Sequence, residues 1–220
     1  AIAYTYTEPT IFFEYSYDIA RLAHDVGIAS VYVTNGYMTR DMLELFQGVA
    51  NSHDPWLDAA NVDLKAFSDE TYRQVCGARL QPVLDSLVSM KELGIWVEVT
   101  TLVVPGLNDS DGELGEIARF IAGELGVETP WHVSRFHPDY KMDDRGPTPA
   151  VTLRRAYELG KEAGLRYVYV GNLPGAHLED THCPDCGSKV VGRWGFQITE
   201  RRTRVGKCAA CGATIDGVGM

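Results

Sequence analysis

The 220 residues predict an α/β fold built on a parallel sheet, followed by a small cysteine-rich module. Strand-like segments alternate with capped helical segments at intervals of about 30 residues, which is typical of right-handed β-α-β crossovers. Four of the five cysteines lie after residue 182, in two Cys-x-x-Cys pairs. A hydrophobic content of 45% excludes a disordered chain, and the longest apolar runs are far shorter than the roughly 20 residues of a membrane span.

Six segments read as strands, and each of them ends in polar or conformationally special residues. Because such residues follow many strands rather than one switch point, the pattern favours a barrel-type sheet with its site at the carboxyl ends of the strands. Six strands do not complete an eight-stranded barrel, so we expect a partial one. The segments are residues 1–6, 30–34, 60–65, 96–104, 131–136 and 167–170.

Helices are expected between these strands. Pro9 suits the first position of a helix that Gly27 ends, and Ser110 with Glu113 forms a capping box for another. Further helices are predicted over residues 80–93 and from Thr148 to Gly164. In the first helix, one face is expected to carry the apolar residues Ile11, Phe12, Tyr15, Ile19, Leu22, Ala23 and Val26.

The cysteine pairs predict a metal site. Two Cys-x-x-Cys-Gly turns facing each other offer the four sulfur ligands of a structural zinc ribbon, whose strands would be residues 189–196 and 197–205. A tail this short needs the metal to fold. A redox dithiol pair and a rubredoxin-like iron site are the alternatives. The four expected ligands are Cys183, Cys186, Cys208 and Cys211.

Charge is distributed unevenly along the chain. The net charge is −10, yet the segment from Cys183 onward has six basic and three acidic residues, so the remaining residues carry −13. The basic tail is either a nucleic-acid finger or a solvated face docked on the acidic body. We favour docking, because its arginines have no interleaved aromatic residues to stack on bases, and we expect no nucleic-acid partner.

Several strand ends carry groups that suit chemistry. Glu8 is placed to bind an ammonium group or, equally, to favour the first turn of a helix. Asp63 and Lys65 alternate along one strand and point to the same side. Lys65 could form a Schiff base or bind an anionic group, and the pair could also be a buried ion pair. His137 follows a strand end and is a further candidate site residue.

Together, five motifs resemble radical S-adenosylmethionine (SAM) proteins related to pyruvate formate-lyase activating enzyme. They are YTYTEPT (4–10), VTNGY (33–37), NVDLKAF (61–67), VVPGLND (103–109) and HVSRFHPDY (132–140). More narrowly, the motifs resemble the radical enzyme of the AmmeMemoRadiSam system, which also ends in a two-knuckle cysteine tail. The resemblance implies a partial (β/α)6 TIM-like barrel over residues 1–176 and a zinc-ribbon-like tail over residues 177–220.

The resemblance also implies cofactors and site residues. The family's Cys-x-x-x-Cys-x-x-Cys loop, which holds a [4Fe-4S] cluster, is absent from this sequence. We therefore expect the first strand and the cluster loop before Ala1, and no activity from these residues alone. Glu8 would meet the amino group of SAM, and Lys65 its carboxylate. The other implied cofactor-binding residues are Thr34, Asn35, Asp63 and His137.

The function predicted for the whole protein is therefore that of a radical SAM enzyme, which generates a 5′-deoxyadenosyl radical to abstract hydrogen from a substrate. The sequence identifies neither the substrate nor a catalytic residue. Flavodoxin or ferredoxin is expected as electron donor, and the unpaired thiols suggest the cytoplasm. The alternatives are a Schiff-base lyase that uses Lys65 and a non-catalytic scaffold whose zinc ribbon binds a partner.

Overall fold

The computed structural model describes residues 1–49, 54–173, 175, 177–195 and 197–218. The chain divides into two compact units, Ala1–Thr100 and Thr101–Met220. Six strands form one sheet in the order β1-β2-β3-β4-β5-β6, and the pairings β1–β2, β2–β3, β3–β4 and β5–β6 are all parallel. Sequence neighbours are sheet neighbours throughout, without the order reversal of a doubly wound sheet. The predicted α/β class is confirmed.

The first unit contains three complete strands and most of a fourth. These are β1 (Ile2–Tyr4), β2 (Ser30–Thr34), β3 (Ala59–Asp63) and β4 (Trp96–Val103). On one face of the sheet, Tyr32, Val62 and Val99 are fully buried, whereas Asn61 and Thr100 on the other face are only partly buried. This alternation follows from the two-residue period of a strand, and it leaves one face of β3 and β4 polar.

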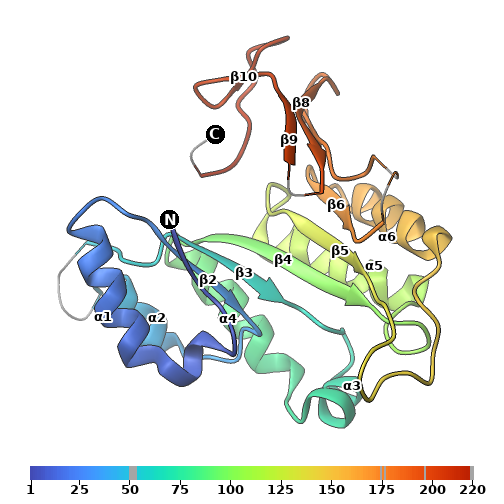
Figure 1. Cartoon of the computed structure of the whole chain (residues 1–220), viewed down its shortest axis with the longest axis horizontal. Helices are drawn as coiled ribbons and strands as arrows, with labels where there is room; N and C mark the ends of the chain where they lie inside the picture. The colour runs from blue at the N-terminus through green and yellow to red at the C-terminus, as the bar shows by residue number, and fades with distance from the viewer. Residues whose placement is uncertain (50–53, 174, 176, 196, 219–220) are drawn as a thin grey trace. The chain divides into compact units, whose positions relative to one another are not determined.

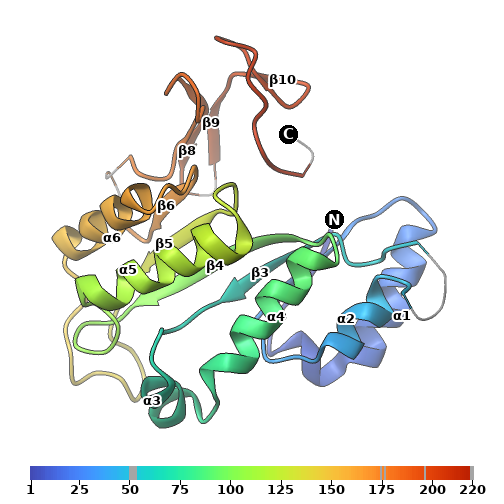
Figure 2. The ribbon, with the colours of Figure 1, turned by 180° about the vertical axis from the view of Figure 1, so that it is seen from behind.

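Helices cover the apolar face of this unit. Figure 2 shows α1 (Phe13–His24), α2 (Arg40–Phe46) and α4 (Leu80–Glu92) on one side of strands β1–β3. Pro9 begins the short helix η1 (Pro9–Phe12) as predicted. The remaining elements are α3 (Asp69–Thr71) and the π-helix η2 (Tyr72–Cys76).

The buried face of α1 differs from the predicted one. Small residues, Ser16, Ala20 and Ala23, are buried, whereas four of the seven apolar residues expected to share a face are exposed. Small side chains let the helix backbone lie close to the sheet, and the larger apolar side chains then point outward. The exposed residues are Ile11, Tyr15, Leu22 and Val26.

The second unit continues the alternation. Helix α5 (Asp111–Phe120) and the π-helix η3 (Ile121–Leu125) precede β5 (Trp131–Arg135), and α6 (Ala150–Glu162) precedes β6 (Val168–Gly171). Helices α5 and α6 lie next to each other along β5 and β6 (Figure 2). Ser110 is the N-cap of α5, and the Ser110 half of the predicted capping box is confirmed, since its Oγ accepts the N–H of Glu113 at 3.2 Å.

The cysteine-rich tail belongs to the second unit. It contains β7 (Thr181–His182), β8 (Lys189–Trp194), β9 (Gln197–Arg201), β10 (Thr203–Arg204) and β11 (Lys207–Cys208). The predicted pairing of its two main strands is confirmed, because β8 and β9 are antiparallel neighbours (Figure 1). The predicted domain boundary after residue 176, and the strand end at Phe196, lie outside the described residues. None of the described helices combines the length and the apolar character that a membrane-spanning helix requires.

Candidate functional site

Glu8 forms the N-cap of η1. Its backbone is extended, and its Oε1 accepts hydrogen bonds from the backbone N–H and the hydroxyl of Thr10, at 3.3 and 2.7 Å. A side chain that caps the first turn in this way satisfies helix donors that have no partner inside the helix. Glu8 thus lies at the N-cap, just before the first turn, rather than within it. Its expected contact with the SAM amino group stays a prediction.

The same carboxylate binds the segment that follows β2. The hydroxyl of Thr34 donates to Oε1 of Glu8 at 2.6 Å, and the backbone N–H of Asn35 donates to Oε2 at 2.8 Å. Glu8 thus accepts four hydrogen bonds and connects the start of η1 to the end of β2. Three of the predicted site residues lie in this one network.

Gly36 permits the tight turn after Asn35. Its φ of +73° is favourable only for glycine, and a Cβ atom there would lie 2.7 Å from Cγ1 of Val62 on β3. Its backbone N–H donates to the hydroxyl of Thr34 at 3.1 Å, and the N–H of Tyr37 donates to Oδ1 of Asn35 at 2.9 Å. The Thr-Asn-Gly motif is therefore a closed turn packed against the neighbouring strand.

Asp63 and Lys65 form an ion pair at the end of β3. Nζ of Lys65 lies 2.7 Å from Oδ2 of Asp63, and the two side chains are 42% and 41% exposed. Val62 and Leu64, on the opposite face, are fully buried. The predicted alternation is confirmed, whereas the interpretation of a buried ion pair is wrong, because both charged groups are accessible from solvent.

Tyr72 supports this pair from the π-helix η2, and sequence reasoning did not identify it. Its hydroxyl accepts the backbone N–H of Lys65 at 3.1 Å, and its side chain is buried. Burial raises the pKa of Tyr72 to about 12, although the hydrogen bond from Lys65 opposes the shift. The hydroxyl therefore stays protonated at neutral pH and positions the backbone next to the ion pair.

The paired strands place these residues at one edge of the sheet. Thr34 pairs with Val62 in the β2–β3 register, so Asn35 and Asp63 both follow the last paired residues at the carboxyl ends of adjacent parallel strands. Further polar groups, Asn61 and Thr100, share a hydrogen bond of 2.8 Å on the polar face below them. A zwitterionic ligand would find an anion and a cation together at this edge.

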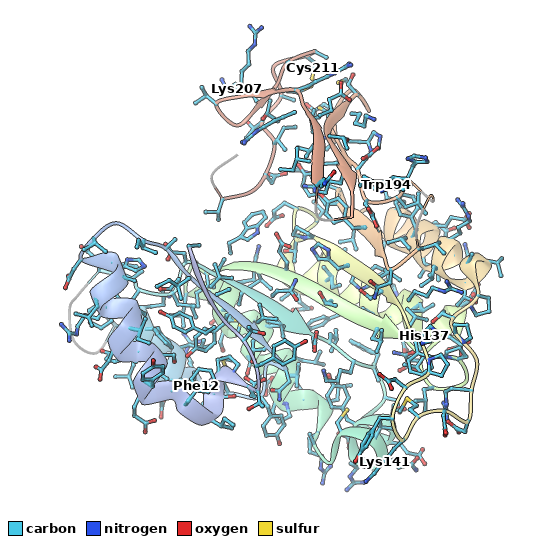
Figure 3. All side chains as sticks on the ribbon, in the orientation of Figure 1. Phe12, His137, Lys141, Trp194, Lys207 and Cys211 are labelled. Atoms are coloured by element: carbon cyan, nitrogen blue, oxygen red, sulfur yellow. The ribbon has the colours of Figure 1, made fainter. Side chains whose placement is uncertain are left out.

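His137 belongs to the second unit, in the loop that follows β5. It is exposed, and its Nδ1 lies 3.0 Å from the carbonyl oxygen of Pro138. Figure 3 shows His137 near the end of β5 and Lys141 farther along the loop that joins β5 to α6. Buried Thr148 ends this loop by accepting the N–H of Phe136 at 2.9 Å. The predicted role of His137 toward the cofactor remains untested.

The four tail cysteines come together as predicted. Their sulfur atoms all lie within 4.8 Å of one another, with 3.6 Å between Cys183 and Cys211 and 3.8 Å between Cys186 and Cys208. Four sulfurs at about 2.3 Å from a tetrahedral zinc ion would be about 3.8 Å apart. The donor set therefore fits a tetrahedral metal ion.

Both cysteine turns have the same backbone hydrogen bonds. Cys183 accepts from Gly187 at 3.0 Å and donates to Ser188 at 2.8 Å, and the turn at Cys208 repeats the pattern with Gly212 and Ala213. The hydroxyl and the backbone N–H of Ser188 lower the pKa of Cys186 to about 6. Hydrogen bonds to a sulfur favour the thiolate form that a metal ion requires.

Comparisons with known proteins agree with this fold. The family model of the radical SAM superfamily matches residues 1–121. The chain is 45% identical over 217 residues to an uncharacterized protein of Methanocaldococcus jannaschii, which covers 98% of this chain and 62% of the relative. It is 25% identical over 141 residues to the pyruvate formate-lyase-activating enzyme of Clostridium pasteurianum, covering 60% of this chain and 56% of that enzyme.

A solved structure supports the fold. A crystallised domain of a pyruvate formate-lyase-activating enzyme from Bacteroides vulgatus superimposes with a TM-score of 0.65, at 14% identity, over 78% of this chain and 98% of that domain. The family match covers more than half of the residues, so the chain belongs to the radical SAM superfamily. Its curated relatives include activating enzymes. The chain spans less than two thirds of the length of the M. jannaschii protein and of the C. pasteurianum enzyme.

Proposed function

We propose that the longer protein containing this chain is a radical SAM enzyme of the activating-enzyme type. In such enzymes, a reduced [4Fe-4S] cluster and SAM together supply a 5′-deoxyadenosyl radical that abstracts hydrogen from a substrate. The accessible ion pair at the end of β3 carries the proposal. Lys65 would bind the carboxylate of SAM, with Asp63 holding the Lys65 ammonium group in place.

The residues around Glu8 would have a positioning role in this site. The carboxylate of Glu8 already accepts four hydrogen bonds, from Thr10, Thr34 and Asn35. Its main contribution would be to hold the turn at Thr34 and Asn35 beside the cofactor, with one oxygen facing the amino group. The contact of His137 with the ribose and adenine of SAM stays a prediction of the family resemblance.

The cluster ligands are expected outside these 220 residues. Cys76 is separate from the tail cysteines, and no Cys-x-x-x-Cys-x-x-Cys sequence is present. The tail cluster cannot replace it, because cleavage of SAM needs one iron with an open coordination position, whereas four cysteines close the site. We propose instead that the tail binds one structural zinc ion. A flavodoxin or ferredoxin would supply the electron.

The Schiff-base alternative has less support. The ammonium group of Lys65 is hydrogen-bonded to Asp63, and an ion-paired ammonium has no lone pair with which to attack a carbonyl carbon. The pair suits a cation that binds an anionic group. A scaffold function would leave the accessible ion pair without a role.

The test is the affinity for SAM of the longer protein, measured by calorimetry under anaerobic conditions. Lys65→Ala should weaken binding roughly 10- to 100-fold, because a charged hydrogen bond is lost. Lys91→Ala is the matched control, since Lys91 lies near the end of α4, over the ring of Trp96. Unchanged affinity in Lys65→Ala would contradict the proposed site.

A further inference from the structure

The cysteine-rich module is attached to the edge strand β6. The backbone N–H of Val170 donates to the carbonyl oxygen of Leu178 at 3.0 Å, at the start of the module. At the other end of the chain, Asp216 accepts hydrogen bonds from the hydroxyl of Tyr167, at 3.0 Å, and from Arg166, at 2.9 Å. The module is therefore anchored at one end to β6 and at the other to the two residues that precede β6.

Arg193 makes the central contact between the module and β6. Its Nη1 donates to the carbonyl oxygen of Glu179 at 3.0 Å and to the hydroxyl of Thr181 at 2.6 Å. Its backbone N–H donates to Oδ1 of Asp180 at 2.7 Å. Held in this way, the guanidinium lies over the ring of Tyr169 on β6, 5.4 Å from its centroid.

Tyr169 in turn contacts a residue of β5. Its hydroxyl shares a hydrogen bond of 2.9 Å with the hydroxyl of Thr181. Its ring lies 5.1 Å from the ring of His132, the residue paired with it in the β5–β6 register. Both side chains occupy the face of the two strands opposite to that of buried Val133 and Val170. His132 is thus connected through Tyr169 to the module.

The hydrophobic core of the module is very small. Among the described residues of the module, it consists of five buried residues, two of which are cysteines of the four-sulfur cluster, with Ala213 packed against it. So few apolar contacts cannot order about 40 residues without a further contribution, which metal binding supplies in domains of this size. Thr181 lies only two residues before Cys183, so ordering of the cysteine turn also orders Thr181 and its partner Arg193.

We propose that metal binding at the four cysteines positions His132. The metal orders the module, the ordered module holds Arg193 over Tyr169, and Tyr169 sets the orientation of the His132 ring on the face of β5 and β6. Arg193 is accordingly a positioning residue. The inference rests on the proposed metal site and is independent of the proposed SAM site.

The test is the nuclear magnetic resonance signal of the His132 ring in the whole protein, with His132→Gln as the assignment variant. Removing the metal with a chelator should shift this signal, because the ring of Tyr169 moves. Arg193→Met should shift it with the metal still bound, whereas Arg193→Lys should restore most of the original position. Arg201→Met is the control, since Arg201 is an exposed residue of β9 that donates to Thr203.

Two further readouts separate the outcomes. His24, which is bound to Asp58 in the first unit, should not shift under any of these conditions. Cobalt(II) absorption reports the metal site directly. If the wild-type protein showed no cobalt(II)-thiolate absorption, both the metal site and this inference would be refuted. Normal cobalt binding with an unchanged His132 signal after Arg193→Met, or after metal removal, would overturn the inference and leave the metal site standing.

Discussion

The backbone N–H of Asn35 donates to Oε2 of Glu8 at 2.8 Å, across 27 residues of sequence. The carboxylate that caps η1 therefore also closes the turn after β2. Thr10 and Thr34 donate three further hydrogen bonds to its other oxygen, Oε1. Any change at Glu8 disturbs both elements together.

Loss of the Thr34 hydroxyl should destabilise the protein. Thr34→Val keeps the shape of the buried side chain but removes the donor to Glu8 and the acceptor for Gly36. The expected loss is about 1–3 kcal/mol of unfolding free energy, measured by urea denaturation. Thr34→Ser retains the hydroxyl and is the control. Equal stability of the two variants would contradict the role given to this hydrogen bond.

Gly36 and Gly27 form a matched pair for measuring the effect of close packing. Both have a φ of +73°, but a Cβ at position 36 would contact Val62 and Val83, whereas a Cβ at position 27 would meet nothing within 4 Å. Gly27→Ala should cost about 1–2 kcal/mol for the backbone conformation alone. Gly36→Ala should cost about 2–4 kcal/mol, because overpacking is added. Equal losses would show that the turn can move away from β3.

Asp69 should make stability depend on pH. The backbone N–H of Leu80 lowers its pKa, and the nearby guanidinium groups of Arg79 and Arg73 lower it further. A lowered folded-state pKa contributes stability above the ordinary aspartate pKa, and this contribution is lost as the pH falls through the folded-state value. Asp69→Asn should therefore lower the Tm at neutral pH, because the charged partner of Leu80 and Arg79 is lost. The difference in Tm between this variant and the wild-type protein should become smaller at acidic pH. A difference in Tm that stays constant across the pH range would contradict this account.

Metal removal should unfold the tail selectively. A chelator, or Cys186→Ser, should abolish cobalt(II)-thiolate absorption and expose the module to proteolysis. Cys76→Ser is the control, because Cys76 lies apart from the cluster, in η2. Elemental analysis of the purified protein distinguishes zinc from iron. A tail that stays protease-resistant without metal would show that its apolar core suffices.

Much of the fold could be predicted because its signals are local. The predicted strand at residues 30–34 matches β2 at both ends, and Pro9 and Ser110 begin helices as expected. Helix α2 was not predicted, since its seven residues are too few to show a clear period. Periodicity also could not tell which face of α1 packs, because the buried face there is made of small residues.

The parts of the site that depend on the spacing of residues within one motif could be predicted from the sequence. Asp63 and Lys65 alternate on a strand, so their shared direction followed from the sequence, and four closely placed sulfurs followed from the cysteine spacing. Tyr72 could not be identified, because its partner is the backbone N–H of Lys65 and a π-turn sets its direction. The shared network of Glu8 and Asn35 depends on strand pairing, which no local pattern reveals.

The small described core of the cysteine-rich module leaves its exposed positions free to vary between homologues. With so few packed side chains, most positions between the two cysteine turns face solvent and can change at little cost. The two glycines, with φ of +70° at Gly187 and +78° at Gly212, are constrained by backbone geometry. We therefore expect homologous tails to share the spacing of cysteine and glycine, the buried Val190 and Val191, and Arg193, while the exposed residues between them diverge.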